Sequence, residues 1–174
     1  MINIRDASID DCKEIGLVTV SASHSVFIGA IPEELIDFSW TPEISAANWR
    51  KSFSENTDRG QRFIVAEEDH RILDFLWAKP WAETAGFEAC IQGLYILPTF
   101  QRSGIGRQLI GYAVTELMQL NMNKLEIACV VENPSCNFYR HIGGVEIGRR
   151  PVKVDNFDTE EIVFGWQDIS VLSG

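Results

Sequence analysis

Hydrophobic residues alternate with polar ones in some parts of the chain and recur at helical spacing in others, which predicts mixed α and β structure. Residues 2–5 read as a short strand. A capping-box pattern beginning at Ser8 precedes a first helix, and Thr41-Pro42 precedes a second, because threonine caps helices and proline fits their first turn. Pro32 is expected to begin a short helical turn between them.

The chain after Gly60 is richer in strands. The predicted strands are residues 62–68, 72–78, 87–97, 124–131, 145–150 and 160–169. The first two flank a short turn and are typical of a β-hairpin. Two helices are expected among them: residues 104–120 carry a clear apolar stripe, and Asn133-Pro134 begins a shorter helix. With no repeats or linkers, the order favours an α/β (α+β) fold in one domain, residues 1–174.

Composition narrows the function classes. A net charge of −10 disfavours a nucleic-acid surface, which needs clustered lysine and arginine. No run approaches the roughly 20 apolar residues of a membrane helix. Arg5 and Asp6 stand where a signal peptide would be apolar, so we expect a cytoplasmic protein without a membrane partner. The four cysteines and three histidines lack metal-ligand spacing, so no metal and reduced thiols are expected.

The stretch 94–106, LYILPTFQRSGIG, places two glycines and an arginine where a strand gives way to a helix. A helix N-terminus leaves about four N–H groups unpaired and carries partial positive charge. Glycine lets a phosphate approach such a backbone closely, and Arg102 and Arg107 add full charges. The pattern favours a pyrophosphate site, with a tight strand-to-helix connection as the alternative.

Two common phosphate loops fit poorly. A Walker A loop needs Lys-Ser/Thr after its last glycine, but Gly106 is followed by Arg107 and Gln108. A Rossmann fingerprint needs a small residue where Leu109 stands, and a second mononucleotide half that the remaining chain is too short to supply. A small nucleotide-dependent oxidoreductase is therefore only a minor alternative.

The stretch instead resembles the acyl-CoA signature of the GNAT superfamily of N-acyltransferases: an apolar strand, proline, then [QR]-x-x-G-x-[GA]. The resemblance implies a GNAT fold, a central mixed, mostly antiparallel sheet of about seven strands with helices on both faces. It implies acetyl-CoA as acyl donor, its pyrophosphate on the loop amides and its pantetheine along the strand. The cofactor-binding residues so implied here are Leu94, Ile96, Gln101, Arg102, Ser103, Gly104, Ile105, Gly106 and Arg107.

Residues 133–139, NPSCNFY, continue the resemblance. On spacing alone their aromatics would be core residues. In the family, the tyrosine protonates the departing thiolate and the asparagine contacts pantetheine, which implies these roles for Tyr139 and Asn133, beside cofactor contacts at Ser135 and Phe138. The chain departs from the pattern in two places: the asparagine is one residue closer than usual, and Gly144 replaces a phenylalanine.

The resemblance implies acetyl transfer to a primary amine of a small molecule or peptide, by direct attack in a ternary complex. Glu88 is the expected general base, because many relatives use a glutamate near the position of Cys90, two residues later; a solvated strand-end carboxylate is the alternative reading. Glu67 and Glu68 are further candidates, and Cys90 lacks an activating partner for an acyl-enzyme. The expected acceptor lining is His24, Phe27, Ile28, Glu33, Glu34 and Trp40.

Two further expectations follow from the resemblance. Family members are often dimers, so a homodimer is conceivable. A GNAT-shaped module that holds coenzyme A without turnover is the main rival to an enzyme, and the presence of both Asn133 and Tyr139 argues against it.

Overall fold

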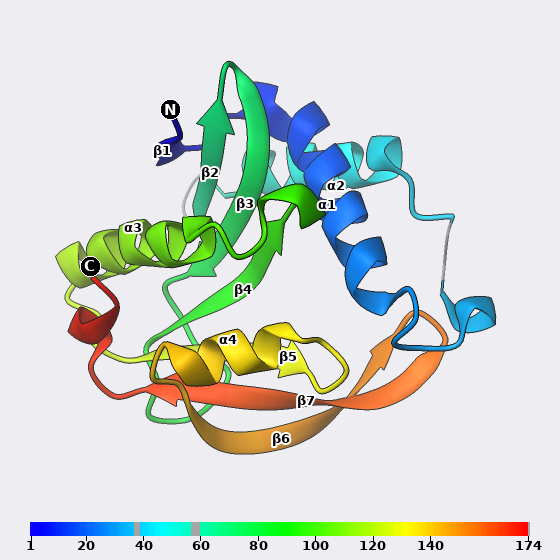
Figure 1. Ribbon diagram of the computed structural model, residues 1–174. Helices are drawn as coiled ribbons and strands as arrows, with labels where there is room; N and C mark the ends of the chain where they lie inside the picture. The colour runs from blue at the N-terminus through cyan, green and yellow to red at the C-terminus, as the bar shows by residue number, and fades with distance from the viewer. Residues whose placement is uncertain (37–38, 57–59, 174) are drawn as a thin grey trace.

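The computed structural model describes residues 1–36, 39–56 and 60–173 (Figure 1). The strands are β1 (Asn3–Asp6), β2 (Arg62–Glu68), β3 (Arg71–Lys79), β4 (Ala89–Ile96), β5 (Leu125–Val130), β6 (Val145–Val154) and β7 (Phe157–Trp166). The helices are α1 (Cys12–Phe27), α2 (Pro42–Ser54), α3 (Ile105–Gln119) and α4 (Ser135–His141). Within the described ranges, no helix is long and apolar enough to cross a bilayer.

All seven strands join one sheet in the order β1-β2-β3-β4-β5-β7-β6. Every neighbouring pair is antiparallel except β4 and β5, which run parallel. Helices α1 and α2 cover one face over β3 and β4, and α3 and α4 cover the other (Figure 1). The predicted mixed, mostly antiparallel sheet with helices on both faces is confirmed.

The two faces have different cores. An aromatic cluster under α1 and α2 centres on Trp49, whose ring meets Phe75 edge-on at 4.7 Å. The core under α3 and α4 is larger and mostly aliphatic. Helices α1 and α2 approach so closely that a Cβ atom on Gly16 would lie 2.4 Å from the carbonyl oxygen of Pro42, which explains a glycine inside α1.

The local signals at the helix starts are confirmed. The Ser8 N–H donates to the Asp11 carboxylate at 2.7 Å, as a capping box requires. Thr41 Oγ1 accepts from the Ile44 N–H at 3.4 Å at the start of α2. Residues Glu33–Leu35 form the short helical turn expected after Pro32.

The last two strands differ from the predicted ranges. They form a continuous hairpin, with β6 reaching Val154 and β7 starting at Phe157. The distal part of this hairpin is largely exposed, so backbone pairing holds it without an apolar pattern that the sequence could reveal. The predicted end of the last strand is a 3₁₀ turn instead, Ile169–Leu172, capped by Asp168, which accepts from the Ser170 N–H at 2.9 Å.

Candidate active site

Strands β4 and β5 form a split in the sheet. They pair only from Ala89 to Ile91, opposite Leu125 to Ile127, and then separate. A register shift beside Trp77 leaves Gln92 outside the β3–β4 ladder at the point where the split opens. From there to Ile96, the β4 edge that faces β5 has no partner strand. Its peptide groups are therefore open to a ligand.

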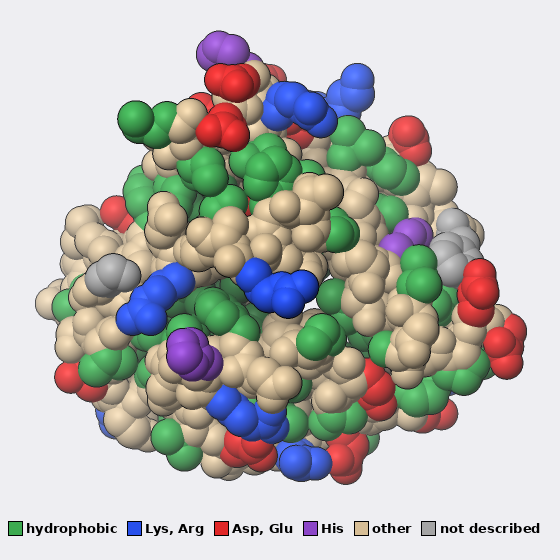
Figure 2. All heavy atoms as spheres, in the orientation of Figure 1, with side chains coloured by type: hydrophobic (Ala, Val, Ile, Leu, Met, Phe, Trp, Pro, Cys, Tyr) green, Lys and Arg blue, Asp and Glu red, His purple; other side chains and the backbone are tan. Residues whose placement is uncertain are grey.

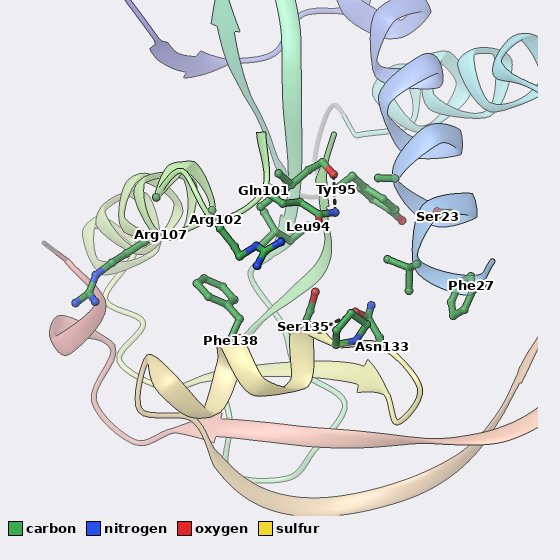
Figure 3. A pocket seen from close by; sticks show the side chains of 16 residues that line it. Ser23, Phe27, Leu94, Tyr95, Gln101, Arg102, Arg107, Asn133, Ser135 and Phe138 are labelled. Atoms are coloured by element: carbon green, nitrogen blue, oxygen red, sulfur yellow. Dashed lines mark hydrogen bonds between the residues drawn. The ribbon is translucent and has the colours of Figure 1, made fainter. Parts of the chain in front are cut away.

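A cavity of about 560 Å³ fills the space above this split, between α1, α3 and α4 (Figure 3). We call it the first cavity. Its lining residues are Ala22, Ser23, Val26, Phe27, Leu94, Tyr95, Ile96, Gln101, Arg102, Gly104, Gly106, Arg107, Asn133, Pro134, Ser135 and Phe138. Figure 2 shows the corresponding hollow in the surface, with a basic side chain at its edge.

The turn before α3 supplies hydrogen-bond donors to the first cavity. The first helical bond of α3 runs from the Gln108 N–H to the Gly104 carbonyl at 3.2 Å, so the amides of residues 105–107 have no partner inside the helix. The turn itself is held by its own side chains: Ser103 Oγ donates to the Phe100 carbonyl, and Gln101 Nε2 donates to the Ile96 carbonyl at 3.4 Å. A fixed row of open N–H groups at a helix start suits an anion.

The two glycines of the turn serve different purposes. Gly104 has φ = +89°, a left-handed conformation that other residues adopt only with strain. At Gly106, a Cβ atom would lie 2.8 Å from Ile96 Cδ1, so the missing side chain lets α3 pack against β4. Gly104 therefore allows the tight turn, and Gly106 allows α3 to lie close to β4.

The two arginines are placed differently. Arg102 extends into the first cavity toward Phe138, whereas Arg107 points away from its centre (Figure 3). Both side chains are exposed. Two predicted cofactor residues do not line the cavity: Ser103 closes the turn, and Ile105 lies in the core under α3.

Helix α4 brings the second motif to the same cavity. Asn133 Oδ1 accepts from the Ser135 N–H at 2.8 Å, so this side chain caps the helix as well as lining the cavity. Ser135 and Phe138 line the cavity from the first turn of α4 (Figure 3).

Tyr139 lies deeper than the rest of its motif. Its side chain is 5% exposed, and its ring packs 5.7 Å from that of Phe164. Burial raises the pKa of the phenol well above its ordinary value, so the hydroxyl stays protonated at neutral pH. This hydroxyl makes no hydrogen bond within residues 1–36, 39–56 and 60–173. A protonated phenol without a hydrogen-bond partner can donate its proton to a ligand that binds beside it.

Tyr139 opens into a second cavity of about 260 Å³ on the other side of the split. Its lining residues are Ser23, Phe27, Glu83, Cys90, Ile91, Gln92, Gly93, Leu94, Tyr95, Glu126, Ile127, Ala128, Cys129, Val130, Asn133, Tyr139, Arg150 and Glu161. Five residues line both cavities: Ser23, Phe27, Leu94, Tyr95 and Asn133. The two cavities therefore meet where β4 leaves β5, beside Tyr139.

The structure does not bring Glu88 to either cavity. Its Oε2 accepts from the backbone N–H groups of Asn123 and Lys124 at 2.6 and 3.1 Å. Glu88 precedes Ala89, the first residue that pairs β4 with β5, so it lies at the closed end of the split, beyond Cys90, the first β4 residue that lines the second cavity. The alternative reading, a carboxylate at a strand end, describes this placement.

The other predicted bases and the predicted acceptor lining are mostly elsewhere. Glu67 pairs with Arg5, and Glu68 pairs with the N-terminal amine. Of the six residues expected to line the acceptor pocket, Phe27 lines both cavities, and the other five line neither. Burial raises the pKa of the Cys90 thiol to about 11, which agrees with the expectation that it forms no acyl-enzyme.

Several cavity residues had no motif to identify them. Ser23 comes from α1, and Arg150 and Glu161 come from β6 and β7. Glu126 did carry a signal, because it is the one charged residue in the apolar strand LEIACV. It is 2% exposed, and its two oxygens accept from the Glu83 and Thr84 N–H groups at 2.7 and 3.2 Å.

Comparisons with known proteins agree with the geometry. The model of the Acetyltransferase (GNAT) family matches residues 30–143. The Bacillus subtilis (strain 168) protein "Uncharacterized N-acetyltransferase YuaI" is 22% identical over 173 residues, 99% of this chain and 96% of that protein. PaiA N-acetyltransferase from Thermoplasma acidophilum, solved in complex with coenzyme A, has a TM-score of 0.75 at 18% identity, covering 95% of this chain and 98% of that one. Salmonella typhimurium YncA, solved with its cofactor acetyl-CoA, has a TM-score of 0.69 at 20% identity, covering 95% and 93%.

Proposed function

The chain belongs to the GNAT acetyltransferase family, and we propose that it transfers an acetyl group from acetyl-CoA to a primary amine of a small molecule or peptide. The observation that carries the proposal is the meeting of two cavities at the unpaired edge of β4, beside Tyr139. A donor and an acceptor can then enter from opposite sides. Reaction follows by direct attack in a ternary complex.

The residues of the first cavity fit coenzyme A. The open amides at the start of α3 and the Arg102 guanidinium match a diphosphate. The unpaired edge of β4 can exchange hydrogen bonds with an extended amide chain such as pantetheine. Asn133, Ser135 and Phe138 close the other wall. When bound, acetyl-CoA supplies an activated acyl group.

Tyr139 acts as the general acid in this proposal. As the neutral amine nitrogen forms its bond to the acyl carbon, the carbon–sulfur bond breaks, and the phenol gives its proton to the sulfur. The nitrogen then loses its second proton through water, which returns a proton to the phenolate and leaves a neutral amide and a free thiol. The raised pKa of Tyr139 keeps the phenol protonated at neutral pH, so the proton is present when the carbon–sulfur bond breaks. A backbone N–H on the free edge of β4 stabilises the charge that develops on the acyl oxygen.

The acceptor amine must lose a proton before it attacks, because an alkylamine has a pKa of about 10. We propose that water in the second cavity carries this proton away. Glu88 receives no role in this step, because two backbone amides occupy its Oε2 at the closed end of the split.

The proposal is tested by titrating the protein with acetyl-CoA in a calorimeter and by following thiol release with a panel of amines. We expect acetyl-CoA to bind, NADH not to bind, and at least one amine to be acetylated. Tighter binding of NADH would support the oxidoreductase alternative. Acetyl-CoA binding without turnover of any amine would favour a module that only holds coenzyme A. The cytoplasmic location and the homodimer stay predictions for fractionation and light scattering.

A further inference from the structure

The second cavity is acidic. Three glutamates line it from three different elements: Glu83 from the loop before β4, Glu126 from β5 and Glu161 from β7. Arg150 from β6 is the one arginine or lysine among the described residues that line it. Three carboxylates against one guanidinium leave a formal charge of −2.

Arg150 is already paired on both sides. Its Nη1 lies 2.7 Å from Glu83 Oε2, and its Nε donates to Glu161 Oε1. Two carboxylates already balance and exceed the charge of this guanidinium, which disfavours the carboxylate of an amino acid beside it. Glu83 and Glu161 each commit one oxygen to Arg150, and the second oxygen of each has no partner among the described residues. These two oxygens can accept hydrogen bonds from a ligand.

A nearby lysine offsets part of the negative charge of this cavity at Gln92 and Cys90 but makes no ion pair with Glu83 or Glu161 among the described residues. Lys79 is absent from its lining, and its ammonium lies over the rings of Trp77 and Trp81 at 4.5 and 5.8 Å. The same ammonium donates to Gln92 Oε1 at 2.8 Å. The excess of negative charge around Glu161 is thus left for a ligand to balance.

A second observation points to a ligand independently of the charges. The Tyr139 hydroxyl lines this cavity, belongs to a residue that is 5% exposed, and has no hydrogen-bond partner in the described parts of the chain. The Cys90 thiol, a weaker donor in a residue that is 7% exposed, lines the cavity without a partner as well. Buried polar groups in folded proteins are nearly always satisfied. Their position in a cavity that joins the donor side indicates that a polar molecule completes them.

We propose that the second cavity binds a small aliphatic acceptor with two amino groups, one of which reacts while the other, as an ammonium, pairs with Glu161 and Glu83. This inference rests on the proposed function and names its acceptor class. The reacting nitrogen lies among the five residues shared by both cavities, and the second nitrogen lies at the acidic end beside Arg150. An amino acid would bring a carboxylate to the same place and be repelled.

Three acceptors with four carbon atoms each test this assignment: putrescine, butylamine and γ-aminobutyrate. Putrescine carries an ammonium on its fourth carbon, whereas the fourth carbon of butylamine is a methyl group and that of γ-aminobutyrate is a carboxylate. We expect kcat/KM to be at least about tenfold higher for putrescine than for butylamine, with γ-aminobutyrate the poorest. Equal values for putrescine and butylamine, or a preference for γ-aminobutyrate, would overturn the inference. So would a peptide N-terminus that is a far better acceptor than all three.

Two variants assign the preference to residues. We expect Glu161→Gln to raise the KM for putrescine about tenfold and Glu83→Gln to raise it about threefold. The KM for butylamine, which has no second amino group, should not change in either variant. Glu83 lies in a loop, so its variant stays informative if the change in β7 disturbs the sheet. Glu160→Gln is the matched control, because this neighbouring glutamate is exposed and lines neither cavity.

Binding separates a failure of this inference from a failure of the proposed function. Putrescine titrated into the protein saturated with coenzyme A should bind, and binding should weaken in the Glu161→Gln variant, whether or not turnover occurs. Turnover of butylamine and putrescine at equal rates would leave the acetyltransferase intact and remove the diamine assignment. Failure of putrescine to bind at all would also remove it.

Discussion

The two cavities meet at one strand edge, but the first is lined mainly by backbone groups and the second by charged side chains. The first presents mainly backbone: open amides at the start of α3, the free edge of β4, and glycines that bring both close. The second presents side-chain charges from β5, β6, β7 and a loop. A backbone site suits a constant ligand, because amides do not change with sequence. A side-chain site can change its ligand one substitution at a time. On the proposed function, the first cavity would hold the donor and the second would determine which acceptor is used.

The largest test of this division is Tyr139→Phe. The change removes the hydroxyl, which has no partner among the described residues, and keeps the ring that packs on Phe164. We expect kcat to fall roughly a hundredfold or more, with acetyl-CoA affinity and melting temperature unchanged. Steady-state kinetics and calorimetry measure both quantities. Tyr112→Phe is the control, since Tyr112 lines neither cavity. A fully active Tyr139 variant would show that this hydroxyl is not the general acid.

A buried carboxylate anchors the backbone next to each cavity, and the two carboxylates differ in one respect. Asp74 is fully buried, and its Oδ1 accepts from the Leu97 N–H at 3.1 Å, directly after the end of β4. Its Oδ2 has no hydrogen-bond partner among the described residues. Glu126 accepts N–H groups with both oxygens. Burial raises the pKa of Asp74 to about 7. The charge of Asp74 is therefore the less well compensated.

The sign of the Asp74 effect follows from proton uptake. Between the ordinary carboxyl pKa of about 4 and about 7, the folded protein holds a proton that the unfolded chain has lost, so stability contributed by this group falls as pH rises through that window. We expect Asp74→Asn to stabilise the protein at pH 8 by on the order of 2 kcal/mol and to change little at pH 5. Glu126→Gln should destabilise by about 1–3 kcal/mol, because one N–H loses its acceptor. Urea unfolding measures both; the same sign for both variants would contradict the contrast.

The turn itself is tested by Gly104→Ala. At φ = +89°, an alanine costs about 1 kcal/mol and displaces the open amides, so we expect about tenfold weaker acetyl-CoA binding. Gly86→Ala is a matched control, since Gly86 also has φ = +89° and open space around its Cα. The two variants should lose similar stability in thermal melts, but the control should keep its affinity. Equal loss of affinity in both would mean that the turn acts through stability alone.

The difference between backbone and side-chain sites also explains which parts of the structure could be predicted from the sequence. The first cavity depends on local conditions, a positive φ at Gly104 and a close approach at Gly106, and these leave fixed residues at fixed spacing. The elements β2, β3, β4, α3, β5 and α4 were predictable from their apolar patterns, and most residues that line the first cavity were predictable from the two motifs. The exposed hairpin of β6 and β7 was predicted too short, because edge pairing through the backbone leaves no apolar pattern.

The second cavity could not be predicted in the same way. Arg150 and Glu161 face each other only because β6 and β7 pair in one register, and neither residue carries a local signal. Glu88 was chosen by alternation along β4, but alternation gives a face and not a position along the split. On this side the motif NPSCNFY supplied Asn133 and Tyr139, and a lone carboxylate in an apolar strand, Glu126, was a further clue.

The smallest expected effect separates the two arginines at the first cavity. Arg102 extends into the cavity and Arg107 points away from its centre, although both side chains are exposed (Figure 3). We expect Arg102→Gln to weaken acetyl-CoA binding about three- to tenfold at low salt, and Arg107→Gln by less than about threefold. Calorimetry at two ionic strengths measures the effect, and added salt should narrow the gap between wild type and the Arg102 variant, because exposed charges are screened. A gap that salt does not change would mean that Arg102 acts through the shape of the turn, so that the first cavity recognises its ligand by backbone alone.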